Sequence, residues 1–576
     1  MRARAGHGRP APSGQGVSRF AARLQDARRA FAANARNPAL RRAQLTFGYA
    51  FAAEWAVTVA LGVVAYHAGG ASAVGLVGFL RTIPAAALGP LGGVVSDRFR
   101  RDRVLAGIGL VRTAAIGGAA ALLVAGAPVG FVYALAVVQT IAFTLVRPTH
   151  SALLPALCRT PRELVSANVV RGSLDSLSLL VGPLLAAVLL GVSAPAGVFV
   201  AAAVLSAASA AVVLRVVYEP LPGEHHRTRL LADAAEGALA LARNARVRLL
   251  TTLGATQTLT RGALSVLVVV FSIELLGTGN AGVGVLTAAV GAGAVLGSLG
   301  VSLLASGRRL GALLGAGVAL WGLPLAIAAL LPYRGPVLVL LAVIGFANAL
   351  VDVGLFTLFA RLVPDHLLGR VLTVDESLLT LGVAVGAIVA PAAVDLLGTR
   401  GAAAAIGLLG PIAAVLAWRA LRRIDAAIDV RDEEIAALQR VDVLGPLPVP
   451  AIEHLAEHVS RLEVDPPAAV VTEGEVGDRL YVIVEGEAEV LRAGKRVRAM
   501  RAGECFGEIA LLRDVPRTAT VRALTPLRLF ALERRHFVPT VSGYRASVTE
   551  AEALVSRRLA SDAAAAGPPR ERPAAP

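Results

Sequence analysis

Twelve long apolar segments dominate the pattern of hydrophobic and polar positions along this chain. Each holds about 20 mostly apolar residues, which as an α-helix is enough to cross the roughly 30 Å hydrocarbon core of a bilayer. The pattern therefore predicts an all-α membrane domain of twelve transmembrane helices whose two ends lie on the same side of the membrane. The segments lie near 44–66, 73–95, 104–125, 129–147, 165–190, 195–217, 249–274, 280–305, 310–331, 336–360, 371–395 and 401–418.

The pattern changes at about residue 420. Residues 419–442 are charged and carry apolar residues at helical spacing, which predicts a helical connector without a flexible Gly/Ser spacer. Residues 443–560 begin with an amphipathic helix, continue as short alternating runs punctuated by glycine, and end with a helix at about 534–560. This predicts an α+β cytosolic domain built on a β-roll. Residues 561–576 are rich in Pro and Ala and are expected to be a disordered tail.

The membrane part repeats itself at an offset of 208 residues. "LGPLGG" at 88–93 matches "LGSLGV" at 296–301, and in the same register Arg100-Arg101 matches Arg308-Arg309 and Pro183 matches Pro391. A duplicated six-helix unit explains why small residues, a basic turn and a helix-bending proline recur in one register. The repeat predicts two six-helix halves, 44–217 and 249–418, joined by a cytoplasmic linker at 218–248, with a cavity between them.

Composition supports a membrane protein and sets its orientation. The 576 residues are 56% hydrophobic and only 17% charged, against about 25% charged in soluble proteins, with a mean hydropathy of +0.67. The net charge of +16 is carried almost wholly by arginine. The arginines concentrate in the loops on the side of the two termini, which by the positive-inside rule is the cytoplasmic side. The basic segment 1–43 is then cytosolic, and basic loops facing membrane lipids explain the charge without a nucleic acid polymer as partner.

The rest of the composition narrows the compartment and the chemistry. An Arg-heavy, Ala-rich chain is typical of a GC-rich bacterial genome, so we expect a multi-pass protein of the bacterial cell (inner) membrane. The two cysteines, Cys158 and Cys505, show no spacing typical of a disulfide or a metal site. We find no catalytic constellation and no metal-ligand pattern, and therefore expect no enzyme activity and no metal.

Several charged side chains lie within the apolar segments, where each is costly unless paired or hydrated. Glu54 is near the middle of the first segment, where its carboxylate could take up and release a proton during transport; an ion pair with an arginine such as Arg81 has equal weight. Arg171 and Asp175 are four residues apart and are expected to neutralise one another. The other candidates for the transport path are Arg81, Arg112, Arg261 and Asp352.

One loop motif points to a family. "GGVVSDRFRRDRVL", after the second segment, resembles the loop signature of the major facilitator superfamily, with Gly93, Asp97, Arg98, Arg101 and Arg103 matching and Arg100 standing where a glycine is usual. The resemblance covers about residues 40–420 and implies a secondary transporter that works by alternating access. "GP" at 182–183 resembles a helix-five signature of exporters in that superfamily, which favours export of a small-molecule substrate.

The stretch "FGEIALLRDVPRTATV" at 506–521 suits an anionic ligand. Gly507 lets the backbone approach a ligand closely, and a short helix starting there points free N–H groups at it. Glu508 can accept hydrogen bonds from sugar hydroxyls, and Arg517 can clamp a phosphate. Phosphate and ribose hydroxyl together are what a protein must recognise in a cyclic nucleotide.

The stretch is closely similar to the phosphate-binding cassette of cyclic nucleotide-binding domains. The resemblance covers about residues 443–560 and implies that Glu508 contacts the ribose 2′-hydroxyl, that Arg517 contacts the cyclic phosphate, and that cAMP, or else cGMP, is a regulatory ligand. It assigns the pocket to Phe506, Gly507, Glu508, Ile509, Ala510, Arg517 and Thr518.

Two alternatives remain open: a β-roll that serves as a ligand-free scaffold, and a cyclic-nucleotide-gated channel. Two matched halves and the lack of a "TVGYG"-like filter loop speak against the channel.

Overall fold

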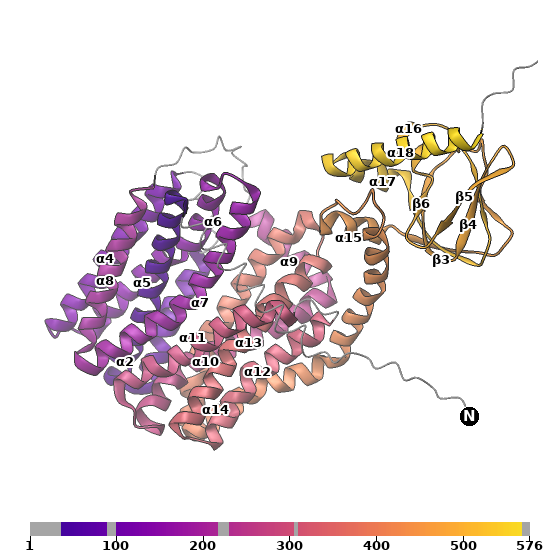
Figure 1. Cartoon of the computed structure of the whole chain (residues 1–576). Helices are drawn as coiled ribbons and strands as arrows, with labels where there is room; N and C mark the ends of the chain where they lie inside the picture. Colours follow the sequence, from indigo (N-terminus) through magenta and orange to yellow (C-terminus); the bar gives the residue numbers. More distant parts are fainter. Residues whose placement is uncertain (1–35, 89–98, 217–229, 305–308, 567–576) are drawn as a thin grey trace, which may run out of the picture. The chain divides into compact units, whose positions relative to one another are not determined.

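The computed structural model describes residues 36–88, 99–216, 230–304 and 309–566. It divides into two compact units, residues 1–424 and 425–576. The first unit is helical and holds the apolar segments, and the second holds all eight strands of the described chain (Figure 1).

Ten helices among the described residues are long and apolar enough to cross a membrane. Six of the described helices lie in the first half. Their bounds are α2 Pro38–Leu88, α4 Arg101–Val124, α5 Val129–Thr144, α6 Val146–Leu157, α7 Pro161–Val192 and α8 Pro195–Val213.

The second half begins within the expected linker. Helix α9 lies in the part of 218–248 that the structure describes, and its amphipathic sequence is too short to span a bilayer. The elements are α9 Leu230–Arg243, α10 Ala245–Val270, the π-helical turn η1 Phe271–Leu275, α11 Gly279–Leu304, α12 Leu310–Leu330, α13 Arg334–Leu362 and α14 Asp365–Gln439.

The predicted number of twelve separate helices is not reproduced, because two of the ten are long and broken. Helix α2 covers the first two predicted segments and breaks at Gly69 and Gly70, where Gly70 has a φ of 63°. Helix α14 covers the last two and breaks at Gly398, with a φ of 70°. A left-handed glycine reverses the chain without a separate loop. Across the first break, Arg81 pairs with Glu54, so the two parts of α2 lie side by side.

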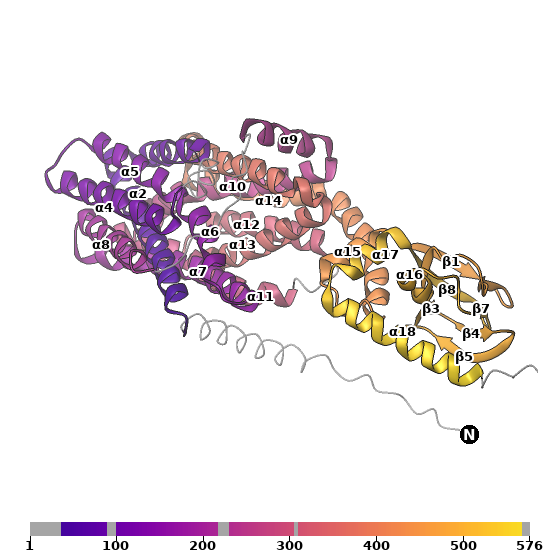
Figure 2. The same cartoon turned by 90° about the horizontal axis from the view of Figure 1, so that it is seen from above.

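The two halves pack through the prolines of the sequence repeat. A Cβ on Gly75 of α2 would lie 2.4 Å from the carbonyl oxygen of Ala387 and 2.6 Å from Pro391 of α14. A Cβ on Gly284 of α11 would lie 2.5 Å from the carbonyl oxygen of Pro183 of α7. The second span of each half therefore contacts the proline-bearing helix of the other half, and only glycine permits this backbone approach. Figure 2 shows the two groups of helices from above.

The second unit is a β-roll of two four-stranded antiparallel sheets. The sheet orders are β1-β8-β3-β6 and β2-β7-β4-β5. Alternating apolar residues of both sheets, such as Ile483, Val490 and Leu529, fill the space between them. The strands are β1 Ser460–Val464, β2 Ala469–Val471, β3 Arg479–Glu485, β4 Glu487–Arg492, β5 Lys495–Arg501, β6 Cys505–Phe506, β7 Thr520–Ala523 and β8 Leu527–Glu533.

Helices cover the outer face of the first sheet. Phe530 and Phe537 belong to a second apolar core between this sheet and the helices. The single helix predicted at 534–560 is wrong, since two helices separated at Gly543 and Tyr544 occupy that stretch, and Pro539 already removes one hydrogen bond there. The helices are α15 Val449–Glu457, α16 Glu508–Arg513, α17 Arg534–Ser542 and α18 Arg545–Ala566.

Candidate functional site

The predicted nucleotide cassette is a strand, a left-handed glycine and a short helix. Strand β6 ends at Phe506, Gly507 has a φ of 92°, and α16 begins at Glu508, as the sequence predicts. A Cβ at position 507 would lie 2.4 Å from Nη1 of Arg517 and 2.8 Å from the carbonyl oxygen of Arg479. The glycine is therefore required both for the backbone turn and for the approach of the arginine.

Arg517 is held in the interior although its chain segment is a surface loop. Its side chain is 5% exposed and donates hydrogen bonds to the carbonyl oxygens of Gly507, at 3.1 Å, and Arg479, at 2.8 Å. The guanidinium also lies 5.8 Å from the centre of the Tyr481 ring. Burial lowers the pKa of Arg517, but from so high a value that the group stays cationic at neutral pH. A buried cation without a carboxylate partner among the described residues suits an anionic ligand.

Glu508 is the buried acid of the cassette. It is 1% exposed, and its Oε1 accepts a hydrogen bond of 2.5 Å from Arg558 of α18, which also donates to the carbonyl oxygen of Cys505. Its Oε2 accepts no hydrogen bond from any residue that the structure describes. Because a buried carboxylate oxygen without a donor is costly, this atom is a ready acceptor for a ligand hydroxyl.

All seven residues predicted for the pocket line one recess, which has an empty volume of about 440 Å³ including its open mouth. Sequence reasoning missed Arg558, because it lies 50 residues beyond Glu508 and no motif marks it. It also missed the apolar wall, to which Val471 and Val490 belong, and Arg498, which lines the recess from β5.

The first half of the membrane unit contains a buried ion cluster. Glu54 pairs with Arg81 at 2.6 Å and with Arg112 of α4 at 2.9 Å. The pairing with Arg81 is one of the two readings that the sequence left open, and the second arginine was not foreseen as a partner. Arg112 is 1% exposed and also donates to the carbonyl oxygen of Ala50. Two cations around one carboxylate give the cluster a net charge of +1.

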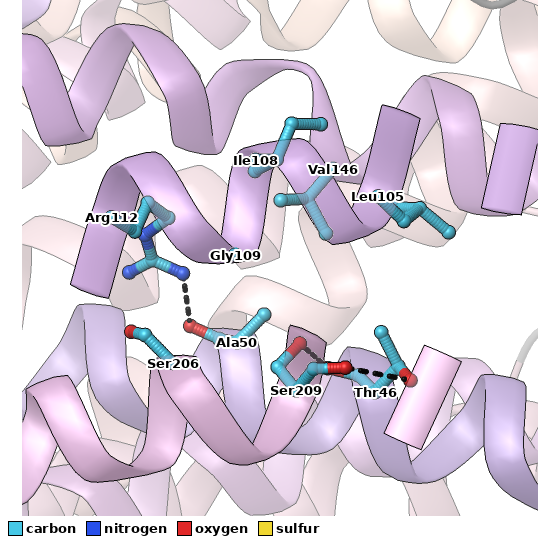
Figure 3. A pocket seen from close by; sticks show the side chains of 9 residues that line it. All are labelled: Thr46, Ala50, Leu105, Ile108, Gly109, Arg112, Val146, Ser206 and Ser209. Carbon is cyan, nitrogen blue, oxygen red and sulfur yellow. Dashed lines mark hydrogen bonds between the residues drawn. The ribbon is translucent and has the colours of Figure 1, made fainter. Parts of the chain in front are cut away.

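Figure 3 shows a narrow recess beside this cluster, lined by residues of α2, α4, α6 and α8. Arg112 lies at one end, where it donates to Ala50. At the other end Thr46 and Ser209 exchange hydrogen bonds with each other's backbone, with Ser209 Oγ donating to the Thr46 carbonyl at 2.9 Å. These bonds lock α2 to α8, so the recess is part of the packed interior of the first half.

The second half holds the other predicted charges in a different environment. Oδ2 of Asp352 accepts a hydrogen bond of 2.8 Å from the neutral amide of Asn348 and makes no ion pair among the described residues. The charges of Arg261 on α10 and of Glu376 on α14 act on Asp352, as do those of Arg147 and Asp175 in the first half. The structure therefore brings Arg261 and Asp352 to one region, next to a charged residue of the other half.

One predicted ion pair within α7 differs in the structure. The expected pair of Arg171 with Asp175 is corrected: Asp175 pairs with Arg147 at 2.7 Å, and Arg171 donates to Ser151. The reason is that α6 places Arg147 beside α7, a neighbour that helical spacing along α7 alone cannot reveal.

The loop signature is only partly described. Gly93, Asp97 and Arg98 lie outside the described residues. Arg101 donates to the carbonyl oxygen of Ala152 at 2.8 Å, and Arg103 is exposed on α4.

Comparison with known proteins gives relatives for the second unit. A cAMP-dependent protein kinase regulatory subunit of Yarrowia lipolytica is 41% identical over 102 residues, which cover 17% of this chain and 27% of that protein. The cGMP-dependent protein kinase egl-4 of Caenorhabditis elegans is 41% identical over 101 residues, which cover 18% of this chain and 13% of that protein. The chain thus spans about a quarter or less of the length of these two relatives.

Among solved structures, the regulatory domain of Toxoplasma gondii PKA with cAMP matches 24% of this chain and 52% of its own, at 27% identity and a TM-score of 0.21. The cyclic nucleotide-binding domain family matches residues 461–542. The Major Facilitator Superfamily matches residues 45–374 and 252–449, which together are well over half of the chain. This multi-pass membrane protein with a cyclic nucleotide-binding domain therefore belongs to the major facilitator superfamily.

Proposed function

We propose that this protein is a secondary active transporter that exports a small molecule and is regulated by a cyclic nucleotide, with cAMP ahead of cGMP. The observation that carries the regulatory part is the pairing of two buried groups in one recess. Glu508 offers an unsatisfied carboxylate oxygen, and Arg517 offers a buried cation. A ribose hydroxyl and a cyclic phosphate are complementary to these two groups.

The roles of the pocket residues follow from this match. Glu508 accepts the 2′-hydroxyl of the ribose, and Arg517 turns from its carbonyl partners to the phosphate. The backbone at Gly507, Ile509 and Ala510 lies next to the phosphate, while Thr518 faces the base. Relatives whose names refer to cAMP and to cGMP are equally similar over this region, so the base preference rests on the binding experiment.

Calorimetry on the purified full-length protein in detergent tests nucleotide binding. We expect saturable binding of cAMP or cGMP, which Arg517→Ala weakens by at least ~1.5 kcal/mol, roughly tenfold in affinity, because a charge-assisted hydrogen bond is lost. Arg513→Ala is the matched control, since Arg513 is an exposed arginine on the same cassette. Loss of binding in both variants would mean that the cassette has unfolded and that Arg517 has no specific role.

A ligand-free scaffold is the second candidate for the β-roll. It is favoured by hydrogen bonds that the charged groups of the recess already make within the protein. Arg558 donates to one oxygen of Glu508, and Arg517 donates to two backbone carbonyl oxygens. The same calorimetric experiment separates the two candidates. Absence of heat with both nucleotides, in protein whose native fold is verified by circular dichroism, would leave the scaffold.

For the transport part we propose a bacterial inner-membrane protein with both termini in the cytoplasm and with its domains divided as the sequence predicts. Asp352 is a better proton carrier than Glu54. Two guanidinium groups compensate the charge of Glu54, whereas the described hydrogen-bond partner of Asp352 is a neutral amide. A carboxylate that lacks a direct counter-charge inside a membrane protein can exchange a proton at lower cost.

Transport experiments test this proposal in two steps. Growth of a deletion strain on a panel of toxic compounds and siderophores identifies an exported compound. Uptake of that compound into inside-out vesicles is then followed with an imposed pH gradient. Asp352→Asn should abolish gradient-driven uptake and leave exchange down a concentration gradient. Gradient-driven uptake at the wild-type rate would remove Asp352 from the coupling mechanism.

A further inference from the structure

Three histidines from two helices meet at the surface of the second unit. His454 and His458 are four residues apart, so they lie on the same side of the chain at the end of α15. His536 lies in the first turn of α17, which packs against α15. The three rings offer ligand nitrogens that all lie within 4.8 Å of one another, and each ring is at least partly exposed.

The geometry fixes which nitrogen of His458 is available. Its Nδ1 lies 2.9 Å from the backbone carbonyl oxygen of His454, and a carbonyl can only accept a hydrogen bond. Nδ1 therefore carries the proton and donates, which leaves the lone pair on Nε2. A ligating histidine in metal proteins is commonly oriented by such a bond from its second nitrogen.

The rings are already gathered for a common ligand. His458 stacks on His536 with ring centres 3.8 Å apart, and the centre of the His454 ring is 4.8 Å from that of His458. In a tetrahedral zinc site with Zn–N bonds of 2.0–2.1 Å, ligand nitrogens are about 3.4 Å apart, which is close to the spacing of the histidine nitrogens here. The rings of His458 and His536, which are stacked at an angle of 21°, must turn about their side-chain bonds to direct both lone pairs at one ion.

We propose that His454, His458 and His536 form a site for a divalent transition metal of the zinc class. Three imidazoles suit Zn²⁺, Co²⁺, Ni²⁺ or Cu²⁺, with water as the remaining ligand, and do not suit Ca²⁺ or Mg²⁺, which prefer oxygen ligands. This site cannot be recognised from the sequence, because His536 is 78 residues beyond His458 and joins it only when α17 folds against α15.

A bound metal would join α15 to the helix next to the nucleotide cassette. Arg534, the first residue of α17, pairs with Asp514 at 2.7 Å and donates to the carbonyl oxygen of Leu511, both of which belong to the cassette. The metal would therefore stabilise the native arrangement of α15 and α17, and ligand binding to the native state alone raises the free energy of unfolding.

Cobalt titration of the tag-free, full-length protein in detergent tests the site. Co²⁺ bound by imidazoles has visible d–d absorption, so we expect a band that saturates at one equivalent and is displaced by Zn²⁺. The triple variant His454→Ala/His458→Ala/His536→Ala should lose the band. His225→Ala/His226→Ala, which removes the only adjacent histidine pair in the sequence, is the matched control and should retain it.

Several outcomes would overturn the proposal. No saturable band in the wild-type protein would show that the three rings only pack on one another. An unchanged band in the triple variant, or loss of the band in the control, would put metal binding elsewhere in the chain. Retention of nucleotide binding or of the native circular dichroism spectrum by the triple variant shows that lost cobalt binding is not a folding defect.

Discussion

At the scale of single residues, the two units treat their buried charges in different ways. The negative charge of Glu54 is neutralised by ion pairs with Arg81 and Arg112, which leaves the cluster with one excess positive charge. Glu508 shares one oxygen with Arg558, while its second oxygen lacks a donor among the described residues. The first arrangement stabilises a fold, and the second leaves binding energy for a ligand.

Replacing Glu54 tests the structural role of the ion cluster. Glu54→Gln leaves two buried guanidinium groups without a counter-charge, and removing one partner of a buried pair typically costs about 3–5 kcal/mol. We expect a clearly lower thermal midpoint in detergent. Glu236→Gln is the control, because its pair with Arg370 is half exposed and worth about 0–1 kcal/mol. Equal midpoints for Glu54→Gln and the wild type would show that the cluster contributes nothing to stability.

Gly477 offers a test of how Arg517 is positioned. A Cβ on Gly477 would lie 2.8 Å from Cζ of Arg517 and 2.8 Å from Cβ of Ala510. Gly477→Ala should therefore displace the guanidinium and weaken nucleotide binding without deleting any binding group. Gly503→Ala separates this effect from backbone strain, since Gly503 has a φ of 94° but nothing within 4 Å of its Cβ. It should lower stability and leave the dissociation constant of the nucleotide unchanged.

At the scale of elements, glycine decides which helices can touch. A Cβ on Gly293 of α11 would lie 1.7 Å from the carbonyl oxygen of Ala342 on α13, and a Cβ on Gly345 of α13 would lie 1.8 Å from that of Val290 on α11. The two backbones thus meet at a pair of mutual glycine contacts. Since lipid is as apolar as leucine, such close packing is a main source of affinity between membrane helices.

A methyl group at this crossing should separate the helices. We expect Gly293→Ala to lower the thermal midpoint by several degrees, because backbone atoms rather than a flexible side chain must move. Gly107→Ala in α4 is the control, since nothing lies within 4 Å of its Cβ and alanine has the higher helix propensity. A control that is destabilised as strongly would mean that any change at a helical glycine is harmful and that the crossing is not special.

At the scale of the whole molecule, helix α14 belongs to both units. It begins at Asp365, includes the last membrane segment and continues to Gln439. In the second unit Glu434 pairs with Arg461 of β1 at 2.7 Å, and Glu433 pairs with Arg528 of β8 at 2.6 Å. The end of the helix is therefore held against the sheet of the β-roll. We expect a helical connector to transmit a displacement that a flexible linker would average out.

Breaking this helix tests whether nucleotide binding controls transport. If the coupling free energy is typical, about 1–3 kcal/mol, nucleotide changes the affinity for the transported compound ~5- to 150-fold, and the compound changes nucleotide affinity by the same factor. Six Gly/Ser residues inserted after Asp429 should erase both effects while nucleotide binding and basal transport persist. A wild-type response of the insertion variant would mean that α14 is only a tether.

Much of this architecture is determined locally, and the sequence alone was sufficient for it. Apolar segments of bilayer length, the repeat at 208 residues and the cassette at 506–521 predict the helical unit, the β-roll and seven of the residues that line the recess. The physical reason is that each is a contiguous pattern: a helix satisfies its own backbone hydrogen bonds, and one left-handed glycine places Arg517 near Glu508 within eleven residues.

What the sequence could not determine depends on which segments lie side by side. Four contacts join residues from different helices. Arg112 pairs with Glu54, and Arg147 takes the place of Arg171 at Asp175. Arg558 pairs with Glu508, and His536 lies beside His454 and His458. The joining of two predicted spans into one broken helix at Gly70 and at Gly398 depends on backbone angles. Such partners are set by helix packing, in which many weak contacts over whole surfaces decide the neighbour, and no spacing along the chain encodes that sum.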